Sequence, residues 1–113
     1  MNEHEKLVQR INLLEFHQKL LLKLLNDPTL DFYKLIIENG LTEQQVDKFY
    51  YMCNELSIKL NVQKAEGYVY FHPLFDELFT SLPANLKIEV VINACLNQKL
   101  FEPLFWEFKK YIE

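Results

Sequence analysis

Residues 7–25, LVQRINLLEFHQKLLLKLL, decide the fold class of this chain. Apolar side chains recur there at alternating intervals of four and three residues, which keeps one face of an α-helix apolar. This seam has one polar member and consists of Leu7, Ile11, Leu14, Gln18, Leu21 and Leu25. Asn2 and Glu5 resemble a capping box ahead of it, and the Asn-Asp-Pro run at residues 26–28 is a stop signal. The pattern predicts a helix over residues 2–26.

The same helix carries a second apolar stripe on another face, formed by Leu13, Phe16, His17, Leu20 and Leu24. At 1.5 Å per residue the helix is about 36 Å long, longer than a domain of this size needs. A helix that is apolar on two faces must be covered from two sides.

Two arrangements would cover both faces. Either the rest of the chain covers both stripes, or the seam packs against copies of itself. We favour self-association, because a lone polar residue at a seam position, here Gln18, typically fixes register and oligomeric state. Gln18 alone does not decide between a dimer and a trimer.

Capping residues, prolines and apolar periodicity predict four or five further helices. They span about residues 30–38, 43–66, 74–82 and 86–98, with a last helix from Pro103 onward. Thr42 and Gln45 form a capping box, and Asn85 is the expected cap of the helix at 86–98. We therefore predict an all-α fold: a single multihelical domain over residues 1–113, with five to six helices. A long N-terminal helix precedes a helical body at residues 30–113.

Two of the predicted helix ends share a turn pattern 59 residues apart. Residues 37–43, IENGLTE, align with residues 96–102, LNQKLFE. Gly40 in the first copy suits a left-handed C-cap, and Lys99 occupies that position in the second. We interpret the match as shared turn chemistry rather than as a repeat.

The composition favours an ordinary helical domain. Half of the 113 residues are hydrophobic and a quarter are charged, and only two glycines are present to build tight turns. The net charge is −4 with mixed signs, so neither nucleic acid nor a membrane is an expected partner. Cys53 and Cys95 do not form a disulfide framework and no signal peptide is recognised, which predicts a cytoplasmic protein.

No stretch has the residue pattern of a known catalytic or metal-binding motif. His4, His17 and His72 have no partners at ligand spacing, and neither HExxH nor CxxC occurs. Cys53 and Cys95 lie among large apolar neighbours, where burial raises the pKa of a thiol and makes it inert. We expect no enzyme activity, no cofactor and no metal site.

Residues 35–56 resemble a helix-turn-helix in part. Gly40, Val46 and Phe49 fit that motif, but Ile36 stands where a small residue is needed. The second helix would also bring carboxylates such as that of Glu43 toward DNA phosphates. An ordinary helical hairpin is favoured, and a DNA-binding regulator is the alternative.

Residues 68–72, YVYFH, are predicted to be extended, because they are β-branched or aromatic and precede a proline. The segment is either a hydrophobic strap over the core or an exposed arm that docks another protein. The surplus of aromatic residues, nine Phe, six Tyr and one Trp, also predicts that some reach the surface. The candidate partner surface consists of Tyr68, Tyr70, Phe71 and His72.

Four segments together resemble a known family: LEFHQKLLL at 14–22, FYKL at 32–35, NGLTEQ at 39–44 and EGYVYFHPLF at 66–75. The chain is similar to the YhaI-like family of small all-helical bacterial proteins of unknown function. The resemblance implies a multihelical fold and a homo-oligomer, and it brings no activity, ligand or catalytic residue. It also implies a glycine where this chain has Lys99, so that either this position is mildly strained or the turn is built differently.

The sequence therefore predicts a non-enzymatic, homo-oligomeric interaction or scaffold protein. Its expected partners are further copies of itself and another protein. The alternatives are the DNA-binding regulator and a small ligand-binding protein.

Overall fold

The computed structural model describes residues 1–112 and is all-helical over that range. Its helices are α1 (Glu3–Asn26), α2 (Asp31–Glu38), α3 (Glu43–Ala65), α4 (His72–Ser81), α5 (Ile88–Asn97) and α6 (Glu102–Lys109). The all-α prediction, the helix number and the long first helix are confirmed.

Two helices, α1 and α3, begin where the sequence predicts an N-cap. In each, the cap side chain accepts a hydrogen bond from a backbone N–H of the first turn. The backbone N–H of Glu5 donates to Asn2 Oδ1 at 2.8 Å, which begins α1. At the start of α3, the N–H of Gln45 donates to Thr42 Oγ1 at 3.1 Å, and the N–H of Thr42 donates to Gln45 Oε1 at 2.9 Å. This reciprocal pair is the predicted capping box.

Two predicted starts are wrong. The fourth helix begins at His72 rather than Leu74, with Pro73 in its first turn, where a missing N–H costs no hydrogen bond. The fifth begins at Ile88 and its N-cap is Lys87, not Asn85. The side chain of Asn85 instead donates to the carbonyl oxygen of Asn39 at 3.4 Å, so it is engaged with the end of α2.

The two aligned turns have the same backbone geometry. Gly40 has φ 64° and Lys99 has φ 62°, both left-handed. After each, a backbone N–H reaches back along the preceding helix, from Leu41 to Ile36 O at 3.0 Å and from Leu100 to Cys95 O at 2.8 Å. Both are helix C-caps of the Schellman type. The sequence match is therefore shared turn chemistry, and Lys99 adopts the left-handed φ that usually falls to glycine, so the alternative of a differently built turn is wrong.

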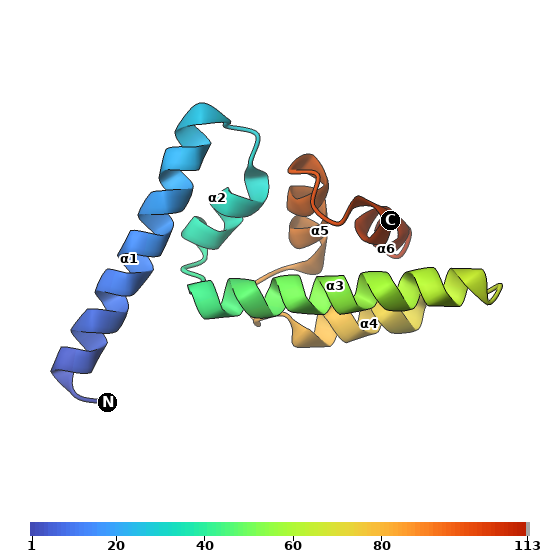
Figure 1. Cartoon of the computed structure of the whole chain (residues 1–113), viewed down its shortest axis with the longest axis horizontal. Coiled ribbons are helices and arrows are strands. Elements are labelled where there is room, and N and C mark those ends of the chain that lie inside the picture. Colours follow the sequence, from blue (N-terminus) through green and yellow to red (C-terminus); the bar gives the residue numbers. More distant parts are fainter. Residues whose placement is uncertain (113) are drawn as a thin grey trace.

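The body of the molecule is built around α3, which has α4 beside it along its second half (Figure 1). Helix α6 also packs on α3, and α5 lies between α6 and α2. The largest fully buried side chains come from α2, α3, α4, α5 and α6, and include Phe32, Leu56, Leu78, Ile92, Phe105 and Phe108. These helices form one hydrophobic core.

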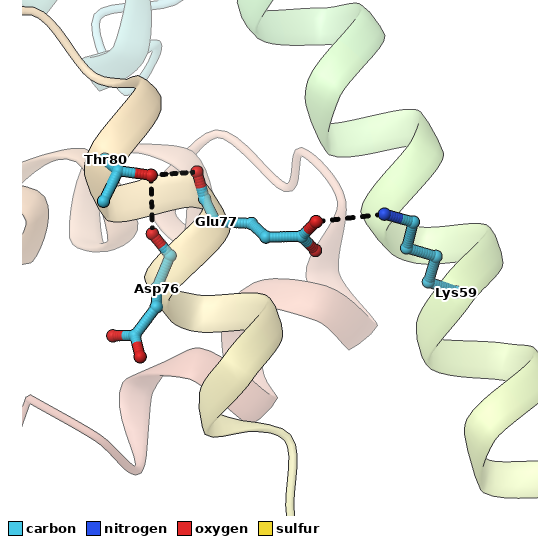
Figure 2. A network of polar contacts seen from close by, with 4 residues as sticks. All are labelled: Lys59, Asp76, Glu77 and Thr80. Atoms are coloured by element: carbon cyan, nitrogen blue, oxygen red, sulfur yellow. Dashed lines mark hydrogen bonds and ion pairs between the residues drawn. The ribbon is translucent and has the colours of Figure 1, made fainter.

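An ion pair also joins α3 to α4. Lys59 Nζ lies 3.0 Å from Glu77 Oε1, and in the same turn of α4 Thr80 Oγ1 donates to the carbonyl oxygens of Asp76 and Glu77 (Figure 2). Both charged side chains are about half exposed, so the pair contributes little beyond the apolar contacts below it.

Helix α1 stands at one end of the molecule, packs mainly on α2, and extends its N-terminal half away from the other helices (Figure 1). The radius of gyration is 15.9 Å, against about 13 Å for a compact domain of this length. The accessible surface is 7597 Å², against about 6,600 Å² for a typical monomer of this mass. The subunit is elongated and exposes more surface than its size requires.

Candidate functional site

One face of α1 is fixed to the body by a buried contact. Leu20 is buried, and so is His17, whose Nε2 donates to the carbonyl oxygen of Leu41 at 2.9 Å. Phe16 packs against the core beside them, and Leu13 and Leu24 are partly covered. This is the second stripe predicted from the sequence, and the body covers it.

The seam lies on a different face of α1, and nothing else in residues 1–112 covers it. All six predicted members are exposed: Leu7, Ile11, Leu14, Gln18, Leu21 and Leu25. The five apolar members expose between 49% and 81% of their surface. The arrangement in which the rest of the chain covers both stripes is therefore wrong for this subunit.

Two residues outside the heptad pattern widen the seam. Val8 and Leu22 are exposed, and each follows a seam position by one residue. With them, the seam presents on the order of 700 Å² of apolar side chain, more than the roughly 300–600 Å² of the largest patch on a typical monomer. A stable interface buries about 800 Å² on each partner. The seam is thus close to the size of one side of a specific interface.

The aromatic segment is divided between surface and core. Tyr68 and Tyr70 are exposed, as the candidate partner surface requires, and Val69 between them exposes 89% of its surface. Phe71 is buried and belongs to the core, so its inclusion in an exposed surface is wrong. Its backbone N–H donates to the hydroxyl oxygen of Tyr111 at 2.9 Å, which holds the segment against the last turn of the chain.

His72 is half-buried at the start of α4, where it contacts other side chains of this end of the molecule. Its ring stacks on Tyr70 at 6.0 Å between centroids and meets Tyr111 edge-on at 5.1 Å. Its Nδ1 lies 3.2 Å from Asp76 Oδ2, one turn further along α4. His72 therefore positions Tyr70, and the exposed part of the segment consists of Tyr68, Val69 and Tyr70.

A groove of about 710 Å³ lies between the first half of α3 and the chain that joins α4 to α5. Its lining is mostly apolar, with Phe49 and Met52 on α3 and Leu82 and Leu86 across from them. Lys48 and Asp47 lie at its edge with opposite charges. No local pattern in the sequence indicates this groove, because it depends on how α3 meets a connection far along the chain.

The family to which the chain belongs follows from a match over nearly its whole length. Residues 4–113 match the family described as a protein of unknown function, DUF1878. The chain belongs to the DUF1878 family.

In this DUF1878 chain both cysteines are core residues, as predicted. Cys53 and Cys95 are fully buried and unpaired, and burial raises the pKa of each thiol well above its usual range. Burial also raises the pKa of the nearby Tyr50 hydroxyl. These groups stay protonated at neutral pH, so neither thiol is a ready nucleophile. Across residues 1–112 there is also no group of three or more side chains placed to hold a metal ion.

The helix-turn-helix candidate of the DUF1878 chain is α2, the Gly40 turn and α3. Ile36 is fully buried, because α2 packs on α5 and α1. At the start of α3, where a recognition helix would approach DNA, Glu43 and Asp47 lie on the first turns, and Glu43 is exposed.

No helix in the part of the chain that the structure describes has the length and apolar character to cross a membrane.

Proposed function

We propose that this DUF1878 protein is a non-enzymatic, homo-oligomeric interaction protein that assembles through the seam of α1. The observation that carries the proposal is the uncovered seam, which is apolar along most of a helix whose other face is fixed to the body. Apolar surface of this extent is stabilised by burial, at roughly 25 cal/mol for each Å² removed from water. A second copy of the same seam is a partner that every cell making this protein contains.

The shape of the subunit also supports the proposal. The elongated subunit exposes more surface than a monomer of its mass normally does, which is expected of a protomer seen apart from its assembly. In the assembly, Tyr68, Val69 and Tyr70 lie on the body, away from α1, and are the surface offered to another protein.

The test is the native mass in solution, by light scattering behind a sizing column, for the wild type and for Leu14→Asp and Leu21→Asp. We expect the wild type to be a multiple of 13.6 kDa and both variants to be monomers with unchanged helical circular dichroism. Asn12→Asp is the matched control, because it adds the same charge to an exposed position of α1 outside the seam. A monomeric wild type, or an assembly that both variants keep, would overturn the proposal.

The groove beside α3 favours one second candidate, the binding of a small apolar molecule. Its volume falls in the range of about 300–1,000 Å³ typical of ligand pockets, and its mostly apolar lining and balanced edge charges suit an uncharged ligand. Screening uncharged hydrophobic compounds by thermal shift tests it, because a ligand specific for the folded state raises the midpoint. Met52→Trp would fill the groove and should remove any such shift; a shift that survives this substitution places the ligand elsewhere.

A further inference from the structure

We propose that the seams of two copies of the chain associate in parallel and in register. This inference rests on the proposed function, since it specifies how copies meet at the surface that the function requires. It concerns the direction of the second α1, which the apolar residues leave open. In heptad positions, Ile11, Gln18 and Leu25 occupy a, and Leu7, Leu14 and Leu21 occupy d. Their spacing reads the same forwards and backwards, so both directions can bury the same leucines.

The first residue that separates the two directions is Gln18, the polar member of the seam. In a parallel pair, a positions meet a positions, so Gln18 faces Gln18 of the second copy and the two amides can donate to each other. In the antiparallel pair of the same register, Gln18 faces Leu14 of the second copy. That arrangement buries an amide against a leucine and leaves it unsatisfied. The parallel pair satisfies the same group.

The charges that flank the seam favour the same direction. Arg10 and Glu15 are exposed on opposite sides of the seam at positions g and e, and neither makes an ion pair within residues 1–112. In a parallel coiled coil, g pairs with the e residue of the next heptad on the other helix, which brings each Arg10 to Glu15 of the second copy. In an antiparallel pair, e faces e, and Glu15 meets another Glu15. The parallel pair therefore contains two attractive contacts between Arg10 and Glu15, whereas the antiparallel pair contains a repulsive contact between two Glu15 carboxylates.

The position of the body supplies an independent argument. His17 and Leu24 occupy g positions and are covered by the body, so the body lies toward the g side of α1. In an antiparallel pair the two g sides face each other, and both bodies would crowd onto one side of the helix pair at nearly the same level. In a parallel pair each g side meets an e side, so the two bodies lie on opposite sides. The e side carries only the exposed residues Val8, Glu15 and Leu22 and has room.

Single cysteines placed at the ends of the seam test the direction. In the parallel pair residue 7 meets residue 7, whereas in the antiparallel pair the two copies of residue 7 are about 27 Å apart, far beyond disulfide range. We expect Leu7→Cys alone, and Leu25→Cys alone, to give at least about tenfold more covalent dimer on mild oxidation than Asn12→Cys, the control outside the seam. The native Cys53 and Cys95 are buried and do not compete.

The outcomes separate this proposal from the proposed function. Cross-links that form only when Leu7→Cys and Leu25→Cys are mixed would show an antiparallel pair and overturn the direction alone. An oligomeric mass without cross-links from either variant or the mixture would show that the seam is not the interface. A monomeric mass would remove both proposals.

Exchanging the charges that flank the seam is a second test of the direction of the helix pair, and it does not depend on oxidation. We expect Glu15→Arg to weaken association about two- to tenfold at low salt, because it places a second guanidinium group beside Arg10 of the other copy. The double variant Arg10→Glu with Glu15→Arg should restore association, since the two charges are then exchanged. Association that Glu15→Arg leaves unchanged would indicate an antiparallel pair, because the substitution would then only exchange a repulsion between two carboxylates for one between two guanidinium groups.

Discussion

The two longest helices, α1 and α3, have similar local features and different surroundings. They contain 24 and 23 residues, and each begins with a side-chain cap. Yet α1 buries only His17 and Leu20, while α3 buries Val46, Cys53, Leu56 and Leu60 in the body, where α4 and α6 pack on it. Caps and periodicity determine that a helix forms, and the neighbouring helices determine how much of it is covered.

The solvent-facing sides of the same two helices differ as well. Away from its core face, α3 exposes Tyr51, Ile58 and Val62, which are separated by polar residues such as Asn54. Scattered apolar residues of this kind are normal on a soluble protein. The seam of α1 is longer and more continuous than this stripe. The comparison shows that α3 belongs to the core of one subunit, and it supports the proposal that α1 makes the contact between subunits.

The strongest test of this difference between α1 and α3 is to shorten one leucine to alanine in each helix. Leu56→Ala, in the buried face of α3, should cost about 2–5 kcal/mol of the free energy of unfolding, because it leaves a cavity in the core. Leu14→Ala, on the seam, should change it by less than about 0.5 kcal/mol in dilute protein. Denaturant unfolding at several protein concentrations measures both.

The concentration dependence decides the interpretation of that pair of variants. The loss in Leu56→Ala should be the same at every protein concentration. Any loss in Leu14→Ala should appear only at high concentration, since it acts through association. Equal losses at all concentrations would mean that the seam is part of the core of a single subunit.

A smaller effect is expected from the contact that holds α1 to the body. His17→Ala removes the donor to the carbonyl oxygen of Leu41 and should cost about 1–3 kcal/mol, because that acceptor is left buried without a partner. Hydrogen exchange in α1 should rise as the helix loosens. His4→Ala, at an exposed position of the same helix, is the control and should change neither quantity. An unchanged His17→Ala protein would show that apolar contacts alone anchor α1.

The features that the sequence predicts well are those carried by residues near one another in the chain. The heptad pattern predicts the seam residue by residue, because such a repeat is a local property of one helix. The box of Thr42 and Gln45, and the left-handed turn at Lys99, also depend on a few neighbouring residues. Whether any of these positions is covered depends on other helices, and that part requires the structure.

The wrong predictions concern features that depend on contacts between residues far apart in the chain. The candidate partner surface wrongly includes Phe71, because an extended segment does not reveal which of its side chains meet the core. Phe71 is buried, and its N–H bonds Tyr111, which lies 40 residues further on. Asn85 is wrongly predicted to be a cap because Asn is a strong N-cap residue, but its side chain bonds Asn39 instead. The groove likewise arises from segments far apart in the chain. In each case a long-range contact prevails over a local preference.

The smallest effect is expected from a substitution at Lys99, in a turn of the body that does not involve α1. Lys99 holds a left-handed φ of 62° at a turn where Gly40 holds 64°, and a side chain there costs about 1–2 kcal/mol of backbone strain. Lys99→Gly relieves the strain but gives the unfolded chain more freedom, so it should stabilise the protein by about 0.5–1 kcal/mol. Thermal unfolding measures the gain, and light scattering should show an unchanged mass.

Two controls separate backbone strain from the charge of Lys99. Lys99→Ala removes the same ammonium group but keeps Cβ, so it should give no comparable gain. Gly40→Ala introduces the same strain at the other turn and should destabilise by about 1 kcal/mol, because a Cβ there meets no neighbouring atom and only the backbone resists it. If Lys99→Gly and Lys99→Ala stabilised equally, the effect would come from charge, and the two turns would not be equivalent. If Lys99→Gly also changed the mass, the body and the seam would be coupled, and the separation of roles between α3 and α1 would fail.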